Sequence, residues 1–137
     1  MFQGFKTGVA RGGIVGHSYR DLIVWQKAKT LAVHVYQQTE AFPKAETYGL
    51  TSQLRRAAIS VVSNIAEGQG RLTSGEFQQF LGHSRGSLLE LETQLEIACE
   101  LRFLDSEVYE NLTQKSYQVL GLINRLLDSL RKIKRAS

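Results

Sequence analysis

The hydrophobic and polar positions of residues 50–71 form two parallel stripes at helical spacing. The first stripe is apolar and predicts an amphipathic helix with one buried face; it consists of Leu50, Leu54, Ala57, Ala58, Val61 and Ile65. The second stripe is polar, with steps of three and four residues, and consists of Gln53, Arg56, Ser60, Asn64 and Glu67. Small Ser and Asn side chains between an Arg and a Glu are unusual on a solvated face. We therefore interpret this stripe as a structural polar network that contacts another helix or another subunit.

Apolar periodicity predicts three further helices. The first begins with Asp21 as N-cap, because a carboxylate accepts from the free N–H groups of a first turn, and it ends near Thr39, before the single proline. Its predicted buried stripe consists of Leu22, Trp25, Ala28, Ala32, Val35 and Tyr36. The second helix, the one with two stripes, spans about residues 47–67. It is followed by Gly68 and Gly70, which suit left-handed C-terminal positions.

The third predicted helix begins at Thr73, which with Glu76 makes a capping box, and runs to about Arg102. Its apolar face consists of Phe77, Phe80, Leu81, Ser84, Leu88, Leu91, Leu95 and Ala98. The fourth begins after Asp105, a second N-cap candidate, and its apolar face consists of Val108, Leu112, Val119, Leu122, Ile123, Leu126, Leu130 and Ile133. Four helices with short connections predict an all-α, antiparallel up-and-down four-helix bundle.

The length and composition agree with this architecture. A chain of 137 residues is long enough for one domain. We divide it into a flexible, glycine-rich basic arm at residues 1–18, which contains five of the twelve glycines, and a bundle domain at residues 19–137. No apolar run reaches the roughly 20 residues that a membrane span needs. The single cysteine excludes an internal disulfide, so we expect a cytoplasmic protein with no membrane partner.

The net charge of +4 is unevenly distributed. The chain is basic at both ends, whereas residues 90–110 contain seven acids and one arginine. Basic ends favour binding of RNA or DNA, and the alternative is that they pair with the acidic segment of a neighbouring copy in a protein–protein scaffold. The predicted phosphate contacts are Arg125, Arg131, Lys132, Lys134 and Arg135, helped by Lys6 and Arg11, with Arg55 and Arg71 as second choices.

The sequence contains no pattern for catalysis, a cofactor or a metal. A di-metal bundle needs Glu-x-x-His on facing helices, and the chain lacks that pattern as well as any phosphate-binding loop or nucleophile motif. Glu90 and Glu92 are two residues apart and point about 200° apart on a helix, so they cannot share one site. We expect Glu90 to pair with Arg56 or Arg55 across a helix contact. These observations predict a protein that is not an enzyme and has no cofactor.

Two glycines lie four residues apart inside the third predicted helix. Gly82 and Gly86 each cost about 1 kcal/mol of helix preference relative to alanine. With Ser84 and Ser87 they form a narrow surface that another helix can approach closely. We interpret it as tight packing of the second and third helices within the monomer. The alternative is a flexible or subunit-contacting segment.

Three segments closely resemble one known protein family: DLIVWQKAKTLAVHVY, FPKAETYGLTSQLRRAAISVVSNIAEGQGR and EFQQFLGHSRGSLLELETQLEIA. The family is a bacterial four-helix-bundle family whose first-described members are encoded by intervening sequences inside 23S ribosomal RNA genes. The resemblance covers about residues 19–130, everything but the arm and the last few residues. The family is also similar to the accessory proteins of diversity-generating retroelements.

The resemblance implies an antiparallel bundle that assembles as a homopentamer and has no enzymatic activity. The related accessory proteins imply binding of nucleic acid together with a partner protein. Our leading hypothesis is a non-enzymatic, homo-oligomeric bundle that binds RNA or DNA through basic surfaces, with the protein–protein scaffold as the alternative. No aromatic residue lies among the C-terminal cations, so we expect weak sequence specificity.

Overall fold

The structure is a computed structural model that describes residues 18–136, with side chains described through residue 133. The elements in this range are two 3-10 turns and four helices: η1 (Tyr19–Asp21), α2 (Ile23–Thr39), η2 (Lys44–Glu46), α3 (Leu50–Gln69), α4 (Ser74–Glu100) and α5 (Ser106–Ala136). No strand occurs between residues 18 and 136. The predicted arm falls almost entirely outside this range, so the proposed boundary at residue 18 stays a prediction.

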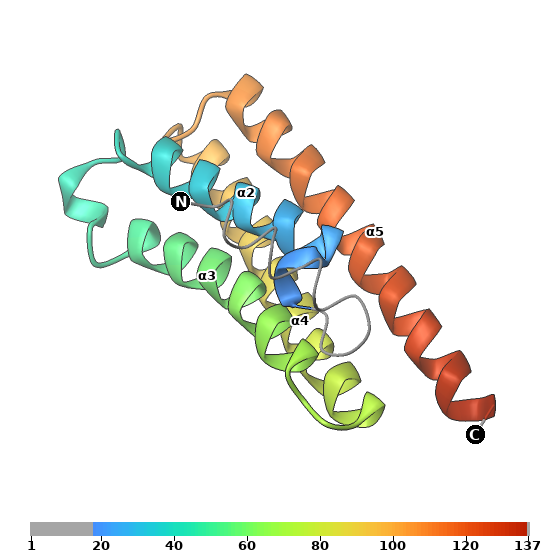
Figure 1. Cartoon of the computed structure of the whole chain (residues 1–137). Coiled ribbons are helices and arrows are strands. Elements are labelled where there is room, and N and C mark those ends of the chain that lie inside the picture. Colours follow the sequence, from blue (N-terminus) through green and yellow to red (C-terminus); the bar gives the residue numbers. More distant parts are fainter. Residues whose placement is uncertain (1–17, 137) are drawn as a thin grey trace.

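The four helices pack as an up-and-down bundle (Figure 1). Each helix packs against its neighbours in sequence, and α5 completes the arrangement by packing against α2. The core between them is almost entirely aliphatic, with large, fully buried side chains from every helix: Leu31, Val35, Leu54, Val61, Ile65, Leu81, Leu88, Leu91, Leu95, Leu112, Val119 and Ile123. The fold class predicted from the spacing of apolar residues is confirmed.

Two of the three predicted N-caps are present. The Thr73 hydroxyl accepts a hydrogen bond from the Glu76 backbone N–H at 3.1 Å and caps α4. The Asp105 carboxylate accepts from the N–H groups of Glu107 at 2.9 Å and Val108 at 3.1 Å, and so caps α5. Side-chain oxygens at these positions satisfy donors that have no partner within the helix.

The prediction that Asp21 caps the first helix is wrong. Helix α2 begins at Ile23, with Leu22 at the N-cap position and no side-chain cap. Asp21 instead ends η1, a turn capped by the Ser18 hydroxyl. Helix α3 also begins three residues later than predicted, and its first N–H, that of Leu50, donates to the carboxylate of Glu46 at 3.0 Å.

The buried faces follow the predicted stripes with two clear exceptions. Ile133, predicted on the apolar face of the last helix, is 59% exposed, because it lies beyond Leu130, where α5 extends past α4. Tyr36 is 40% exposed, because it lies beside the buried Val35 at the edge of the α2 stripe and contacts a neighbouring arginine instead of the core. Trp25 is half-buried against the core. Ser84 was predicted on the apolar face and is fully buried, with its hydroxyl donating to the Val61 carbonyl at 2.7 Å. This bond ties α4 directly to the backbone of α3.

The predicted left-handed glycines after α3 are not left-handed. Gly68 lies inside the helix, and Gly70 has a φ of −80°. Gly68 has a packing role, because a Cβ there would lie 2.9 Å from Phe77 Cδ1 and 2.9 Å from Phe80 Cβ. Among the described non-glycine residues, the left-handed position belongs to Arg102, with φ 67°, immediately after α4.

Gly68→Ala tests the close contact between the end of α3 and the start of α4. The added methyl group must displace Phe77 and Phe80, which costs more than the helix preference of alanine gains, so we expect the free energy of unfolding to fall by about 1–2 kcal/mol. Gly121→Ala is the matched control, because a Cβ at Gly121 meets nothing within 4 Å; it is expected to raise stability by up to about 1 kcal/mol. Urea unfolding followed by circular dichroism measures both. Equal shifts in the same direction would contradict the packing role of Gly68.

Candidate functional site

The C-terminal part of α5 forms a basic end of the molecule. Arg125, Arg131 and Lys132 are exposed there, and among the described side chains Arg131 makes a long ion pair with Asp128, at 3.8 Å. Lys134 and Arg135 follow on the same helix, and their side chains lie outside the described residues, as do Lys6 and Arg11 entirely. The structure therefore brings three of the predicted phosphate contacts together on one exposed helix end.

Helix α5 extends past the helix beside it. The Ser74 hydroxyl, at the start of α4, donates to the Leu130 carbonyl at 3.4 Å, so the two helices are level at that point. Residues 131–136 continue beyond it for roughly 9 Å, at 1.5 Å per residue, and Figure 1 shows this last part of α5 clear of the other helices. Cations here also complement the negative end of the helix dipole. The overhang makes them accessible to a large partner.

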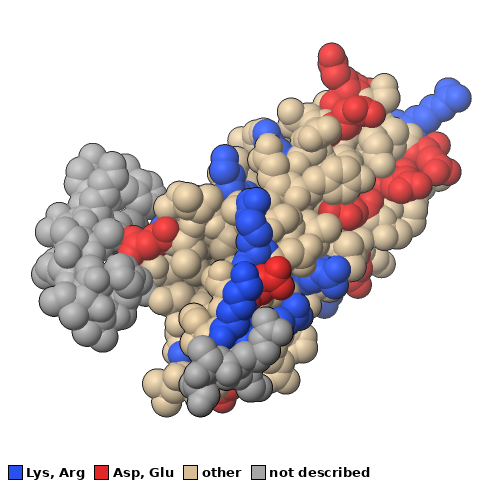
Figure 2. Space-filling view, turned by 90° about the vertical axis from the view of Figure 1, so that its right-hand side faces the viewer, with Lys and Arg blue, Asp and Glu red and all other residues tan. Residues whose placement is uncertain are grey.

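The opposite end of the bundle is acidic. Asp105, Glu107 and Glu110 line one open depression at the start of α5, and Glu96 and Glu100 line another at the end of α4. Figure 2 shows a run of Lys and Arg side chains over the face seen there, with Asp and Glu side chains gathered toward its upper end. The molecule is therefore electrically polar along the bundle axis, basic where α5 ends and acidic where it begins.

Arg55 stabilises the contact between α3 and the end of α2. Its Nε donates to the Thr39 hydroxyl at 2.8 Å and a terminal nitrogen donates to the Tyr36 carbonyl at 3.1 Å. The guanidinium also lies 4.5 Å from the centre of the Tyr36 ring and 3.7 Å from the Glu40 carboxylate. These contacts place a positive charge at the C-terminal end of α2, where the helix dipole favours it. They leave Arg55 little freedom to bind a phosphate.

Arg71 is held more loosely, at the basic end. It pairs with Glu67 one turn earlier at 3.1 Å, and its guanidinium lies 4.5 Å from the centre of the Phe80 ring. Its side chain is 41% exposed. An exposed ion pair of this kind is weak, so Arg71 stays a secondary candidate for phosphate contact.

Part of the predicted polar network is present between α3 and α4. The hydroxyls of Ser60 and Ser87 share a hydrogen bond of 2.7 Å, and the Asn64 amide donates to the Ser60 carbonyl and hydroxyl at 2.8 and 3.1 Å. One heptad away on each helix, the Gln94 amide donates to Gln53 Oε1 at 3.3 Å. The small polar side chains of the stripe therefore join two helices, as predicted.

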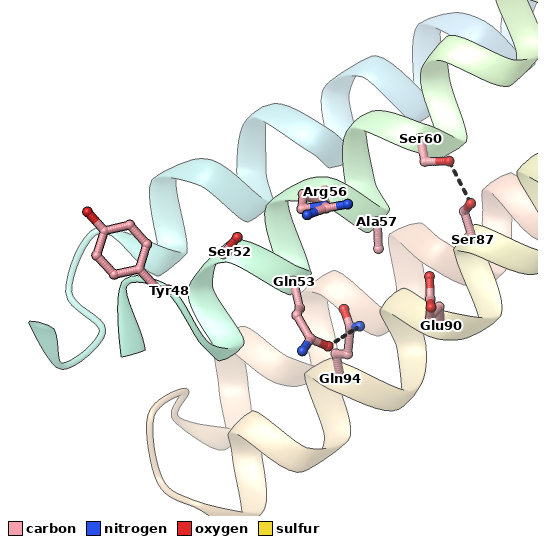
Figure 3. A pocket seen from close by; sticks show the side chains of 9 residues that line it. All are labelled: Tyr48, Ser52, Gln53, Arg56, Ala57, Ser60, Ser87, Glu90 and Gln94. Atoms are coloured by element: carbon pink, nitrogen blue, oxygen red, sulfur yellow. Dashed lines mark hydrogen bonds between the residues drawn. The ribbon is translucent and has the colours of Figure 1, made fainter. Parts of the chain in front are cut away.

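The predicted ion pair of Glu90 with Arg56 or Arg55 is absent from the described chain. Arg56 and Glu90 are both exposed, and Glu67 pairs with Arg71 rather than with Arg56. The two bridges Ser60–Ser87 and Gln53–Gln94 hold α3 and α4 at a spacing that leaves an open pocket of about 500 Å³ between them. Figure 3 shows Arg56 and Glu90 on the two helices that border this pocket, with Ala57 at its floor.

The predicted packing role of two glycines is also wrong. Gly82 and Gly86 are exposed, and a Cβ added at either would meet nothing within 4 Å, so they do not bring α4 toward α3. Their neighbours perform that role instead: Ser84 binds the α3 backbone and Ser87 binds Ser60. Within a helix of 3.6 residues per turn, positions 82 and 86 lie on a different face from position 84.

Two further observations limit the chemistry of the described residues. No three His, Cys, Asp or Glu side chains in that part of the chain lie close enough to hold a metal ion. Within the same range, no helix has the length and apolar character that crossing a membrane requires.

The sequence profile of the 23S rRNA-intervening sequence proteins matches residues 20–125, well over half of the chain. The chain belongs to this family. Among solved structures it is similar to a protein of unknown function from the S23 ribosomal protein family of Bacteroides thetaiotaomicron, with a TM-score of 0.70 and 20% identity. The similarity covers 77% of this chain and 98% of that one. At this identity the match shows the fold alone. No curated protein matches the chain.

Membership of the 23S rRNA-intervening sequence family confirms the resemblance seen in the sequence. Two features of this family member could not be found from periodicity. Gln94 is 9% exposed although its position is polar, and Glu92 accepts a hydrogen bond from the fully buried Ser116. The burial of Ser116 could have been predicted in part, because Ser116 lies between Leu112 and Val119 on the apolar face of α5.

Arg55→Gln distinguishes a structural arginine from a phosphate contact. Because Arg55 joins α3 to the end of α2 and is only partly exposed, its loss is expected to lower the free energy of unfolding by about 1–2 kcal/mol. Affinity for nucleic acid should stay unchanged. Lys27→Gln, at an exposed position, is the control and should change stability by less than about 0.5 kcal/mol. An Arg55→Gln protein of normal stability with weakened nucleic-acid binding would show that the assignment is wrong.

Proposed function

We propose that this protein is a non-enzymatic, homo-oligomeric helical bundle that binds RNA or DNA through the basic end of α5. The observation that supports this most strongly is the exposure of Arg131 and Lys132 on a helix end that extends past α4, with exposed Arg125 six residues earlier on the same helix. Lys134 and Arg135 continue the same basic run in the sequence. Five cations within eleven residues, opposed by Asp128 alone, provide the positive field that a phosphate backbone requires.

The chemistry of this end favours contacts to phosphates over contacts to bases. Lys and Arg side chains on a single exposed helix end bind a backbone, while specific readout needs side chains placed against base edges or stacked on them. No aromatic residue follows Tyr117 in the sequence. The proposed binding is therefore strongly dependent on salt and nearly independent of sequence. Lys6 and Arg11 belong to the same proposal as additional contacts.

Family membership bears on how the protein assembles, and it gives no evidence for nucleic-acid binding. The family is named after intervening sequences of 23S rRNA, and this name does not assign a ligand to its members. The resemblance implies a homopentamer acting beside a partner protein, and the single cysteine favours a cytoplasmic location; we adopt these as parts of the proposal. A ring of copies would present several basic helix ends together, which raises the affinity for an extended polyanion through multivalency.

The alternative proposal is a protein–protein scaffold without a nucleic-acid role. The observation in its favour is the charge polarity of the bundle, since the acidic end around Asp105, Glu107 and Glu110 could receive the basic end of another copy. In this alternative the cations of α5 contribute to assembly, and removing them breaks the oligomer.

A salt titration distinguishes the two functions. Wild-type protein is expected to bind a structured RNA with an affinity that falls steeply as salt rises, because each phosphate contact releases condensed counterion. Replacing Arg131, Lys132, Lys134 and Arg135 with glutamine should flatten the slope of log affinity against log salt by about 3–4, at roughly 0.7–0.9 per contact. Binding should weaken similarly for all sequences while the oligomer stays intact.

The matched control removes the same amount of charge elsewhere, by glutamine at Lys27, Lys44, Arg102 and Lys115. This variant should keep most of the slope, since none of these positions lies in the last two turns of α5. A wild type whose binding does not respond to salt, or equal slopes for the two variants, would contradict the assignment to α5. Loss of the oligomer without any nucleic-acid binding would favour the scaffold.

A further inference from the structure

Packing among the described residues does not require glycine at two positions of α4. Gly82 and Gly86 lie inside a 27-residue helix, where each costs about 1 kcal/mol relative to alanine. By contrast, a Cβ at Gly68 would collide with two phenylalanines. At Gly82 and Gly86 a Cβ would meet nothing within 4 Å. Contacts within the described part of the chain therefore do not explain these two glycines.

The two glycines begin an exposed stripe that continues along α4 with apolar side chains. Leu89, Thr93 and Ile97 follow at steps of three, four and four residues, the spacing of a seam between packed helices. Leu89 is 42% exposed and Ile97 is 46% exposed. Small residues followed by aliphatic ones form a surface that another helix can approach closely.

Unpaired polar groups lie beside this stripe. Gln94 is 9% exposed, and its Oε1 atom is buried without a hydrogen-bond partner among the described residues. A buried acceptor in this state is unfavourable until a donor reaches it. Gln94 lines both the pocket that contains Arg56 and a second depression along Gly82, Gly86 and Glu90. The two hollows therefore form one continuous α3–α4 groove.

We propose that the α3–α4 groove is the surface on which a helix of a second copy of this chain docks, with Arg56 of one copy paired to Glu90 of its neighbour. The inference rests on the homo-oligomeric part of the proposed function and names the surface and residues that produce it. In the docked state the neighbouring helix approaches over Gly82 and Gly86, covers Leu89 and Ile97, and supplies a donor to Gln94.

The charges of the groove select a second copy over a nucleic acid. Arg56 and Glu90 are the charged side chains that line the pocket, and they have opposite signs and no partner within the described chain. Their fields largely cancel, so the groove has no attraction for a polyanion. In a ring of copies, the guanidinium of each copy can meet the carboxylate of the next, because the groove presents both signs.

Larger side chains at the two glycines test the close approach. In the double variant Gly82→Gln/Gly86→Gln the monomer should fold as well as wild type or better, because both positions are exposed and open. Its subunit dissociation constant should rise at least about thirtyfold, because the bulk displaces the groove's contacts. Analytical ultracentrifugation measures the mass against the 15.4 kDa chain. Gly121→Gln, on α5, is the control and should leave the mass unchanged.

Charge reversal tests the intermolecular pair. Arg56→Glu and Glu90→Arg should each dissociate the oligomer, and the double variant Arg56→Glu/Glu90→Arg should restore it. An equimolar mixture of the two single variants should also reassociate, because each then offers the charge that the other lacks. Recovery by mixing requires the pair to join different molecules, which a contact inside one chain does not explain.

The outcomes separate this inference from the proposed function. If the variants dissociate and still bind a structured RNA with the wild-type salt slope per chain, the result supports both the groove assignment and the proposed nucleic-acid binding. A wild type that is oligomeric, with glycine and charge variants of unchanged mass, overturns the groove assignment and leaves the oligomer and the basic end standing. A monomeric wild type overturns the groove and the oligomer together, whatever its affinity for RNA.

Discussion

Small side chains where α3 crosses α4 bring the two helix backbones close together, and the groove between these helices follows from that contact. Gly68 admits the phenylalanines of α4, Ala57 leaves room between the helices, and the Ser84 hydroxyl replaces a side-chain contact with a bond to the Val61 carbonyl. Such a buried hydrogen bond fixes the axial position of one helix on the other, because a shift would leave both groups unsatisfied. The α3–α4 groove is a consequence of this alignment.

The elements that sequence reasoning predicted well were those that depend on local chemistry or strong periodicity. The caps at Thr73 and Asp105 use side chains within three residues of the donors they satisfy, so the pattern alone identifies them. The prediction that Asp21 is an N-cap was wrong because a 3-10 turn precedes α2 and changes where the helix starts. The prediction that Tyr36 is buried was wrong because Tyr36 lies at the edge of the apolar stripe. At that edge, contact of its ring with an arginine of α3 determines the orientation of the side chain. Such choices depend on tertiary contacts that one helix does not contain.

The polar stripe of α3 was recognised, but its pairing was not. Spacing showed that Arg56 lies on the same face as Ser60 and Asn64, and this is correct. Which partner each residue takes depends on the distance between helices, and the serine bridge holds α3 and α4 so that the short side chains meet while the charged ones flank a pocket. The same geometry is compatible with our two proposals, because it keeps the groove between α3 and α4 apart from the exposed, basic end of α5.

Hydrogen–deuterium exchange along the assembled protein, with and without a structured RNA, tests the proposed basic end of α5 most directly. Amides of residues 131–136 lie on a helix end that extends past α4, so they should exchange quickly in the free protein and slow down by at least about tenfold when RNA is bound. Amides of residues 82–97, which face the proposed neighbour, should be protected to the same degree in both conditions. Unchanged exchange at residues 131–136 in the presence of saturating RNA, or protection confined to another part of the bundle, would contradict the account.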